Sequence, residues 1–298
     1  MVHAAVIINP ISGTGRRPEE ARRRAELAVS LLDARGVEAE IFVTERGGHA
    51  RELAQAAVAR GVTLCIAWGG DGTINEVASA LAFSPVALAV IPSGSGNGLA
   101  RELAIPLLPA DAFNVALNGR EHLIDAGEIN GRLFFNVAGL GFDAHVAHKF
   151  AEQGHARRGF ARYITIALRE LFGFEPDHYV ITANGRRVET RALLIAIANS
   201  RQYGNGATIA PRARIDDGAL DIVVVGERSP WTAMIQIPAL FSGKADRLPG
   251  VTIISTAQVD ICASRPVVYH VDGEPALSGK SLQAKIHPGA LHIRVPTQ

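Results

Sequence analysis

The chain has 298 residues, of which 48% are hydrophobic and 20% are charged, and its formal net charge is +1. This length favours two domains over one small core, and the composition is that of a globular protein rather than a disordered one. A chain with nearly equal numbers of acidic and basic residues has no global field of the kind that attracts nucleic acid.

The N-terminus and the two cysteines indicate where the protein works. The stretch MVHAAVIINP has a short apolar run but no basic start, so we do not expect a signal peptide. No apolar stretch reaches the roughly 18 residues that a membrane-spanning helix needs. Cys65 and Cys262 lie in apolar, strand-like runs, and we expect two buried thiols rather than a disulfide or a metal motif. These features predict a cytoplasmic protein that is soluble or that contacts the inner membrane face peripherally.

The first 120 or so residues alternate between apolar, strand-like runs and segments with helical composition. This alternation predicts a parallel sheet with flanking helices, and the uniformly apolar strands suit burial on both faces of that sheet. Pro18 and the acidic residues after it mark the start of the first helix, and Gly36 marks its end. The predicted strands are 4–8, 38–45, 62–68 and 85–92, and the predicted helices are 17–36, 47–61, 74–82, 98–105 and 109–119.

After Glu121 the pattern becomes mainly strand-like, and we place a domain boundary near residue 124. Asn-Gly pairs at 130–131 and 184–185 are typical turns of β-hairpins, so this half is expected to be mostly antiparallel. The two predicted domains are residues 1–124 and 125–290. The predicted strands here are 121–129, 132–142, 178–183, 186–200, 218–227, 251–264, 266–277 and 282–296, interrupted by helices at 156–174 and 229–244.

The stretch Gly69-Gly-Asp-Gly-Thr73 follows a buried strand and admits two interpretations. Asp-Gly between apolar runs is a strong hairpin signal. Thr73 and Glu76, however, have the spacing of a capping box, with Thr73 as the N-cap and Glu76 reaching back, and helical residues follow. We therefore expect the stretch to join a strand to a helix. Its glycines leave backbone N–H groups open at a helix N-terminus, which favours a bound anion such as phosphate.

Two other loops share this layout, from Asn9 to Gly15 and from Pro92 to Gly98. Loops of this kind lie at the carboxyl ends of parallel strands, where ligands bind in open sheets. Three of them at one sheet edge favour the phosphate chain of a nucleotide, whereas tight strand–helix packing is the alternative explanation of any single loop. None of the three matches G-x-G-x-x-G with an acid about 20 residues on, so a dinucleotide site is not indicated.

Asp71 is the one acidic residue inside this predicted phosphate cradle. Its carboxylate would repel bound phosphates unless Mg²⁺ bridges them or the carboxylate handles a proton. A simple turn would accept Asn at the same position. Asp71 is therefore a candidate catalytic residue.

These motifs resemble those of the diacylglycerol kinase catalytic-domain family, which includes the bacterial soluble lipid kinases and, more distantly, the sphingosine kinases. The resemblance covers nearly the whole chain. It rests on Asn9-Pro-Ile-Ser-Gly13, on Gly69 to Thr73 with Asn75-Glu76, and on Pro92-Ser-Gly-Ser-Gly-Asn97. It continues in GLGFDAHV, in YGNG with APRARIDDGALDIVVV, and in VDGE. NAD kinases and phosphofructokinases share GGDGT, so that motif alone is not specific.

The resemblance implies a fold of two domains. The N-terminal domain would be an α/β domain like that of NAD kinase, with a parallel sheet, flanking helices and ATP at the Gly-rich loops. The C-terminal domain would be a mainly antiparallel β-sandwich, with the acceptor lipid in the interdomain cleft. The resemblance also allows the last strand, about 291–298, to return to the first domain.

The resemblance also implies roles for individual residues. Glu274 would be the general base on the lipid hydroxyl, with Asp272 beside it. Without the resemblance, Asp272-Gly273-Glu274 would be interpreted as a β-turn. Asp217, with backbone oxygens of Arg214 and Ala219, would hold a structural Mg²⁺, although DDGALD by itself reads first as a turn into a strand. The implied ATP-binding residues are Asn9, Pro10, Ser12, Gly13, Thr44, Gly69, Gly70, Asp71, Gly72, Thr73, Asn75 and Ser95.

The sequence indicates the molecule that accepts the phosphate less specifically than it indicates the nucleotide. Sphingosine kinases carry an acid at the position where we align His145, and Asp143 is nearby in the sequence. Because His145 is not an acid, a sphingoid acceptor is less strongly indicated. Ile164, Leu168 and Leu171 are spaced to share one helical face. Arg157, Arg158 and Arg162 give the helix a basic start. That helix is either a core-packing helix with a solvated basic end or a lipid-facing wall with a basic interfacial patch.

We therefore expect an ATP- and Mg²⁺-dependent lipid kinase whose acceptor is diacylglycerol or a related glycerolipid. Phosphoryl transfer needs in-line positioning and charge neutralisation more than covalent help, which suits these residue types. Three alternatives stay open: an NAD kinase-like enzyme, a sphingoid kinase, and a non-catalytic regulator that binds a nucleotide or a lipid. An NAD kinase would keep GGDGT but not the GSGNG loop or VDGE.

Overall fold

The structure is a computed structural model that describes residues 3–12, 18–152 and 160–297. The chain divides into two compact units, residues 1–124 with 289–298 and residues 125–288. The predicted order, an α/β fold followed by a mainly antiparallel β fold, is confirmed. Within the described ranges, no helix is long and apolar enough to cross a membrane.

The first unit is built on a parallel sheet with the strand order β2-β1-β3-β4. Near the end of the chain, β17 pairs with β4 in parallel through Ile293 and Leu88, so the last residues extend this sheet. Strands β1, β3 and β4 are almost wholly buried, as expected for a parallel sheet that is covered on both faces. The strands are β1 (His3–Ile8), β2 (Glu38–Val43), β3 (Leu64–Gly69), β4 (Ala87–Pro92) and β17 (Ser281–Val295).

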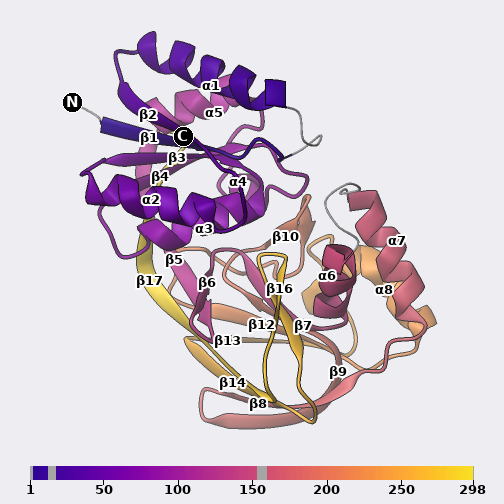
Figure 1. The fold of residues 1–298 in the computed structure, drawn as a ribbon. Helices are drawn as coiled ribbons and strands as arrows, with labels where there is room; N and C mark the ends of the chain where they lie inside the picture. The colour runs from indigo at the N-terminus through magenta and orange to yellow at the C-terminus, as the bar shows by residue number, and fades with distance from the viewer. Residues whose placement is uncertain (1–2, 13–17, 153–159, 298) are drawn as a thin grey trace. The chain divides into compact units, whose positions relative to one another are not determined.

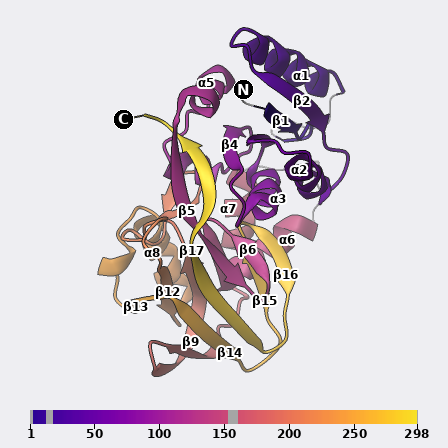
Figure 2. The same cartoon turned by 90° about the vertical axis from the view of Figure 1, so that its left-hand side faces the viewer.

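Helices cover both faces of this sheet, as Figures 1 and 2 show. Helix α1 packs on β1 and β2 and α5 packs on β4, whereas α2 and α3 pack against each other and cover the opposite face. A short helix, α4, follows the third glycine-rich loop. The helices are α1 (Pro18–Asp33), α2 (His49–Ala59), α3 (Asp71–Leu81), α4 (Gly98–Glu102) and α5 (Pro109–Asn118).

The second unit consists mainly of antiparallel strands. Both predicted Asn-Gly turns are present, and all four of their residues have positive φ, which explains why Asn and Gly occupy them. The strands are β5 (Arg120–Ile129), β6 (Arg132–Phe134), β7 (Val137–Gly141), β8 (Asp177–Ala183), β9 (Arg186–Ala198), β12 (Leu220–Gly226), β13 (Val251–Thr256), β14 (Gln258–Ala263), β15 (Val268–Val271) and β16 (Glu274–Leu277), with a small separate pair of β10 (Gln202–Gly204) and β11 (Ala207–Thr208).

Strands β7, β9 and β12 form the centre of the second unit because both of their faces are buried. Side chains on one face, such as Leu140 and Ile195, pack with those of β8, β14, β15 and β17. Side chains on the other face, such as Leu194 and Val223, pack under three helices. These helices are α6 (Phe142–Glu152), α7 (Phe160–Leu171) and α8 (Pro230–Leu240).

The helices of the second unit differ from the sequence-based expectation. Helix α6 was not expected from the sequence, because Val137 to Phe142 looks like one uninterrupted strand. Helix α7 is described from Phe160 to Leu171, so it ends before the predicted 174. Arg157 and Arg158 of its expected basic start lie outside the described residues, whereas Arg162 lies in the helix. Leu171 is buried, but Ile164 and Leu168 are exposed, so the three residues do not all pack into the core.

The cysteines are only partly as expected. Cys65 on β3 is buried, and burial raises the pKa of its thiol to about 12. Cys262 is exposed, because alternate side chains of β14 point to opposite sides and Cys262 lies on the outer side. The expectation of two buried thiols is therefore wrong for Cys262.

Candidate functional site

The three glycine-rich loops of the first unit are joined by direct hydrogen bonds. The side-chain amide of Asn9, after β1, donates to the Thr73 hydroxyl of α3 at 2.7 Å. The hydroxyls of Ser12 and Ser93 lie 2.6 Å apart, which joins the loops after β1 and β4. The Ser93 N–H donates to the Gly69 carbonyl at 2.8 Å. The described part of the three predicted loops therefore meets at one sheet edge, as the parallel topology requires.

Arg24 on α1 organises the first of these loops and was missed by the sequence analysis. Its guanidinium is buried and donates to the Ser12 hydroxyl at 2.8 Å, the Ser12 carbonyl at 2.9 Å and the Asn9 carbonyl at 2.8 Å. Glu20, one turn earlier, pairs with it at 3.2 Å. In the sequence, Arg22, Arg23 and Arg24 look alike, so a basic run on a surface helix conceals the one that points inward.

The glycines of two loops allow a close backbone approach. A Cβ atom on Gly94 would lie 2.7 Å from the Gly70 Cα, and a Cβ on Gly69 would lie 2.5 Å from the Thr73 Cβ. Side chains at these positions would clash, so tight packing alone explains part of the glycine pattern. The predicted packing alternative and the predicted anion cradle are therefore compatible, because the same glycines can serve both.

Asp71 is held by the N-terminus of α4. Its Oδ2 accepts from the Asn97 N–H at 2.9 Å, and its Oδ1 accepts from the Gly98 N–H at 2.7 Å. Asn97 adopts a left-handed conformation, and its side chain bonds the Gly94 N–H and carbonyl at 2.9 Å each. The negative charge of Asp71 is thus offset by backbone N–H groups. From the sequence, only Mg²⁺ or a role in proton transfer was considered for this carboxylate.

The predicted capping box is wrong. Helix α3 begins at Asp71 with Gly70 as its N-cap, and no side chain bonds that cap. The two carboxylate oxygens of Glu76 instead accept from the Gly48 N–H at 2.8 Å and the Ala50 N–H at 3.1 Å, at the start of α2. Thr73 and Glu76 have the right spacing, but each has a partner distant in sequence, which a local motif cannot reveal.

The other predicted ATP-binding residues lie around the same loops. Pro10 follows Asn9, Gly72 lies in the first turn of α3, and Asn75 accepts from the Ser79 hydroxyl at 3.4 Å. Thr44 is buried directly after β2, and its N–H donates to the Ile8 carbonyl at 2.9 Å. Ser95 is exposed. Gly13 lies outside the described residues.

In the second unit, Asp272 is a structural anchor of the turn between β15 and β16. Its Oδ2 accepts from the Phe135 N–H at 3.0 Å, and its Oδ1 accepts from the N–H groups of Asn136 and Val137 at 3.0 and 3.1 Å. Asp272 and Gly273 both have positive φ, as in a two-residue hairpin turn. Three backbone donors thus fix this carboxylate next to the start of β16.

Glu274 is the first residue of β16 and is exposed, unlike the anchored carboxylate two residues before it. The β-turn that the sequence predicts for Asp272 and Gly273 is therefore present, and it leaves the carboxylate of Glu274 exposed. The two acids therefore differ: the Asp272 carboxylate holds the turn, whereas the Glu274 carboxylate is exposed.

The predicted Mg²⁺ loop contains oxygen donors but no compact acidic cluster. Asp217 is exposed, and its Oδ1 accepts from the Ala219 N–H at 3.1 Å. Asp125, which the sequence analysis did not single out, accepts from the Gly218 N–H at 2.7 Å. Carboxylate and carbonyl oxygens suit a hard cation. Among the described residues, there is no group of three or more His, Cys, Asp or Glu side chains that could hold a metal ion. A Mg²⁺ here would therefore need the carbonyls of Arg214 and Ala219.

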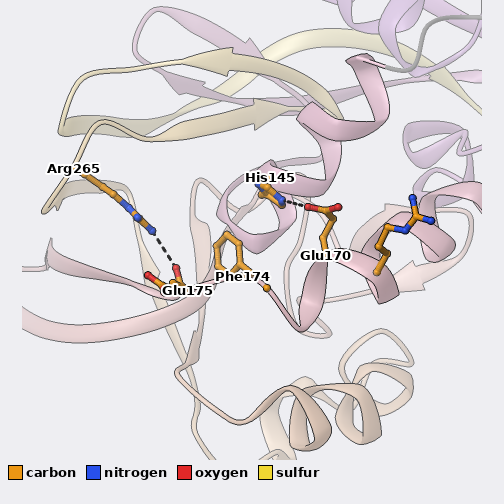
Figure 3. Close-up of a pocket in the computed structure, with 7 residues that line it drawn as sticks. His145, Glu170, Phe174, Glu175 and Arg265 are labelled. Atoms are coloured by element: carbon orange, nitrogen blue, oxygen red, sulfur yellow. Dashed lines mark hydrogen bonds and ion pairs between the residues drawn. The ribbon is translucent and has the colours of Figure 1, made fainter.

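A cavity of about 540 Å³ lies beside α6 and α7 in the second unit (Figure 3). His145, the residue aligned with the sphingoid-binding acid, bonds Glu170 of α7 at 2.7 Å. The hydrogen bond from His145 lowers the pKa of Glu170. A carboxylate is therefore present beside this position, although it is supplied by a different helix. The cavity is lined by His145, Arg169, Glu170, Gly173, Phe174, Glu175 and Arg265.

Two family models match the chain. The diacylglycerol kinase catalytic domain matches residues 3–129, and the YegS C-terminal NAD kinase beta sandwich-like domain matches residues 136–295. A Klebsiella pneumoniae protein named "Probable lipid kinase YegS-like" is 33% identical over 291 residues, which cover 96% of this chain and 94% of that protein. A Pseudomonas aeruginosa protein of the same name is 33% identical over 271 residues, which cover 90% and 88%.

Solved structures show the same fold. A structure described as a diacylglycerol kinase from Bacillus anthracis has a TM-score of 0.74 at 22% identity and covers 99% of this chain and 97% of its own. A second structure from that organism has a TM-score of 0.80 at 24% identity, covering 99% and 95%. The predicted family and the predicted fold class are thereby confirmed. The chain therefore belongs to the diacylglycerol kinase catalytic-domain family and, as a member of it, is a phosphotransferase with a YegS-type C-terminal domain.

Proposed function

We propose that this protein transfers the γ-phosphate of ATP, with Mg²⁺, to the hydroxyl of diacylglycerol or a related glycerolipid. The observation that carries the proposal is the joining of three strand-end loops by the Asn9–Thr73, Ser12–Ser93 and Asp71–Gly98 hydrogen bonds. The names of its relatives, which describe lipid kinases, support the lipid acceptor.

The loops of the first unit would hold ATP through backbone groups. The first turn of α3, from Asp71 to Thr73, presents N–H groups at the positive end of a helix dipole, which suits phosphate oxygens. Arg24 is already occupied by Ser12 and Asn9, so it would shape the first loop rather than bind phosphate. Asp71 would act by positioning α4 against α3, and its negative charge would be offset by the two N–H groups it accepts.

Glu274 would accept the proton of the lipid hydroxyl. A general base must reach that proton within hydrogen-bond distance, and the exposure of the Glu274 carboxylate on a turn held by backbone bonds supports this role. Asp272 would keep the turn in place through its three backbone bonds. Bound Mg²⁺ would neutralise charge on the phosphates, and a further, structural Mg²⁺ would be held by Asp217 with the carbonyls of Arg214 and Ala219.

We also propose that helices α7 and α8 contact the lipid surface peripherally. Trp231 and Ile235 of α8 are 63% and 75% exposed, and Phe172 at the end of α7 packs edge-on against Trp231 with ring centroids 5.1 Å apart. Exposed Lys244 and Arg247 follow α8. Exposed aromatic and aliphatic side chains on a helix that basic residues follow in the chain suit an interfacial helix.

The test is incubation with ATP and Mg²⁺ and a panel of diacylglycerol, other lipids, sphingosine and NAD, with radiolabelled phosphate followed into each product. We expect labelled phosphatidate or a related lipid phosphate, and Glu274→Gln should lower the rate by about 10²–10⁴-fold. Label in the NAD product alone would refute the lipid acceptor. Equal rates for Glu274→Gln and the wild type would refute the base assignment.

A further inference from the structure

The turn that carries Glu274 is held by a buried side chain in addition to Asp272. The N–H of Gly273, the residue directly before Glu274, donates to Nδ1 of His270 at 3.3 Å. His270 belongs to β15 and is buried. Its side chain therefore reaches under the hairpin and contacts the backbone of the turn, and it is too buried to touch an acceptor molecule.

His270 is itself held by Asp143 of α6. The His270 Nε2 lies 2.5 Å from Asp143 Oδ2, and Asp143 is buried as well. The Tyr163 hydroxyl of α7 donates to the other oxygen, Oδ1, at 3.1 Å. A cross-strand glycine makes room for the pair, since a Cβ on Gly139 would lie 2.1 Å from Asp143 Oδ2 and 2.5 Å from His270 Nε2.

These two contacts specify one form of the imidazole. A neutral histidine has one N–H and one acceptor nitrogen. Only the form with its proton on Nε2 can donate to Asp143 and accept from Gly273 at the same time. Asp143 thus fixes the proton of His270 at Nε2 and leaves Nδ1 free to accept.

We propose that His270, held by Asp143, is a positioning residue that fixes the Gly273 peptide and thereby the direction of the Glu274 carboxylate. The proposal rests on the proposed function, in which Glu274 is the base. Two anchors then act on consecutive residues of the turn: Asp272 binds the Phe135–Val137 backbone, and His270 binds the Gly273 N–H. A base that is misplaced by about 1 Å loses much of its rate.

The groups around His270 determine the pH at which its imidazole takes up a second proton. Asp143 of α6, Tyr163 of α7, Tyr203 of β10 and Asp272 of the turn all face it or its partner. Burial acts to lower the pKa of His270, but the charge and hydrogen bond of Asp143, together with Asp272, raise it overall. A proton on Nδ1 removes the acceptor of the Gly273 N–H.

The first test does not depend on activity. The ¹⁵N shifts of the imidazole, followed through a pH titration, identify the tautomer of the neutral form, and amide exchange reports on the Gly273 N–H. We expect the Nε2–H form and a protected Gly273 amide. In Asp143→Asn, the amide oxygen stays with Tyr163 and its nitrogen faces His270, which should move the proton to Nδ1 and expose the Gly273 amide. An Nδ1–H form in the wild type would overturn the proposal.

The second test compares substitutions of His270. His270→Leu removes the acceptor, and we expect kcat to fall about 10–100-fold with the KM for ATP unchanged. His270→Asn keeps an acceptor near the Nδ1 position and should restore kcat to within a few-fold of the wild type. The control is His178→Leu, an exposed histidine of β8, which should behave as the wild type.

The outcomes separate this proposal from the proposed function. A wild type that phosphorylates no acceptor would refute the function, while the tautomer and the amide exchange would still decide the role of His270. A folded His270→Leu variant with unchanged kcat would overturn the positioning role. So would a His270→Asn variant as impaired as His270→Leu, since the acceptor would then not be the feature that matters.

Discussion

The carboxylate of Asp71 binds the first N–H of helix α4: its Oδ1 accepts from the Gly98 N–H at 2.7 Å, while Oδ2 accepts from Asn97. An acidic residue inside a predicted phosphate cradle is electrostatically unfavourable unless something offsets its charge. Here two backbone donors at a helix N-terminus do so. Asp71 therefore connects the GGDGT loop with the GSGNG loop, and the relative position of the two loops depends on it.

Asp71→Asn should damage both stability and ATP use. An amide presents one oxygen and one nitrogen, so one of the two N–H groups would face another donor, at a cost of about 1–3 kcal/mol. We expect a lower free energy of unfolding in urea and a weaker affinity for ATP by calorimetry. Asp33→Asn, at the exposed end of α1, is the control. An Asp71→Asn variant with wild-type stability and ATP affinity would show that the link is dispensable.

Much of the first unit could be predicted from the sequence, because its signals are local. Apolar runs such as Leu64 to Trp68 predict buried strands, and glycines at strand ends predict the loops of a parallel sheet edge. The Asn-Gly pairs predict hairpin turns, since both residues need positive φ. These features require no knowledge of distant partners.

What could not be predicted depends on partners that are far apart in the chain. Glu76 caps α2 rather than α3, Arg24 alone of three adjacent arginines points inward, and Asp71 binds the next loop. Helix α6 was missed because Gly141, with positive φ, ends a strand where the apolar pattern continues. In each case tertiary structure chose among options that the local sequence left open.

Glu76→Gln should destabilise the first unit through α2 rather than α3. Its carboxylate accepts from Gly48 and Ala50, and loss of such a cap costs about 0.5–2 kcal/mol. The matched control is Glu52→Gln, because Glu52 forms an exposed pair with Arg46 at 2.6 Å that should contribute less than about 1 kcal/mol. Urea unfolding gives the free energies, and amide exchange should quicken at Gly48 and Ala50. Faster exchange at the start of α3 instead would contradict the assignment.

Asp177 should make stability depend on pH in the acid range. Burial acts to raise the pKa of Asp177, but hydrogen bonds from Ser264 and from the His178 N–H, together with the charge of Arg265, lower it overall. Because the folded-state pKa is below the unfolded value of about 3.9, the ionised carboxylate stabilises the fold above that pH. The contribution is lost as the pH falls through the folded-state pKa.

Asp177→Asn should therefore lower the free energy of unfolding by about 1–3 kcal/mol at neutral pH, and the difference from the wild type should shrink below about pH 4. Denaturant unfolding at several pH values measures both quantities. The control is Asp260→Asn, which alters an exposed residue of β14 that accepts a hydrogen bond from Gln283, and it should show a smaller difference at neutral pH. A difference that grows as the pH falls would mean that the pKa shift has the opposite sign.

The exposed apolar side chains of α8 should govern binding to lipid vesicles. Trp231 and Ile235 are four residues apart, so they lie on one helical face, and burial of an aliphatic side chain in lipid is worth about 1.5–3 kcal/mol. Ile235→Ser should weaken binding to anionic vesicles about tenfold, with little change in kcat on a short-chain, soluble acceptor. Because Lys244 and Arg247 follow the helix, binding should also weaken as salt rises.

Leu108→Ser, which alters a similarly exposed residue of the first unit, should bind vesicles as the wild type does. Equal vesicle binding by all three proteins would rule out α8 as the contact, and a loss of kcat on the soluble acceptor would mean that Ile235 acts in the reaction itself.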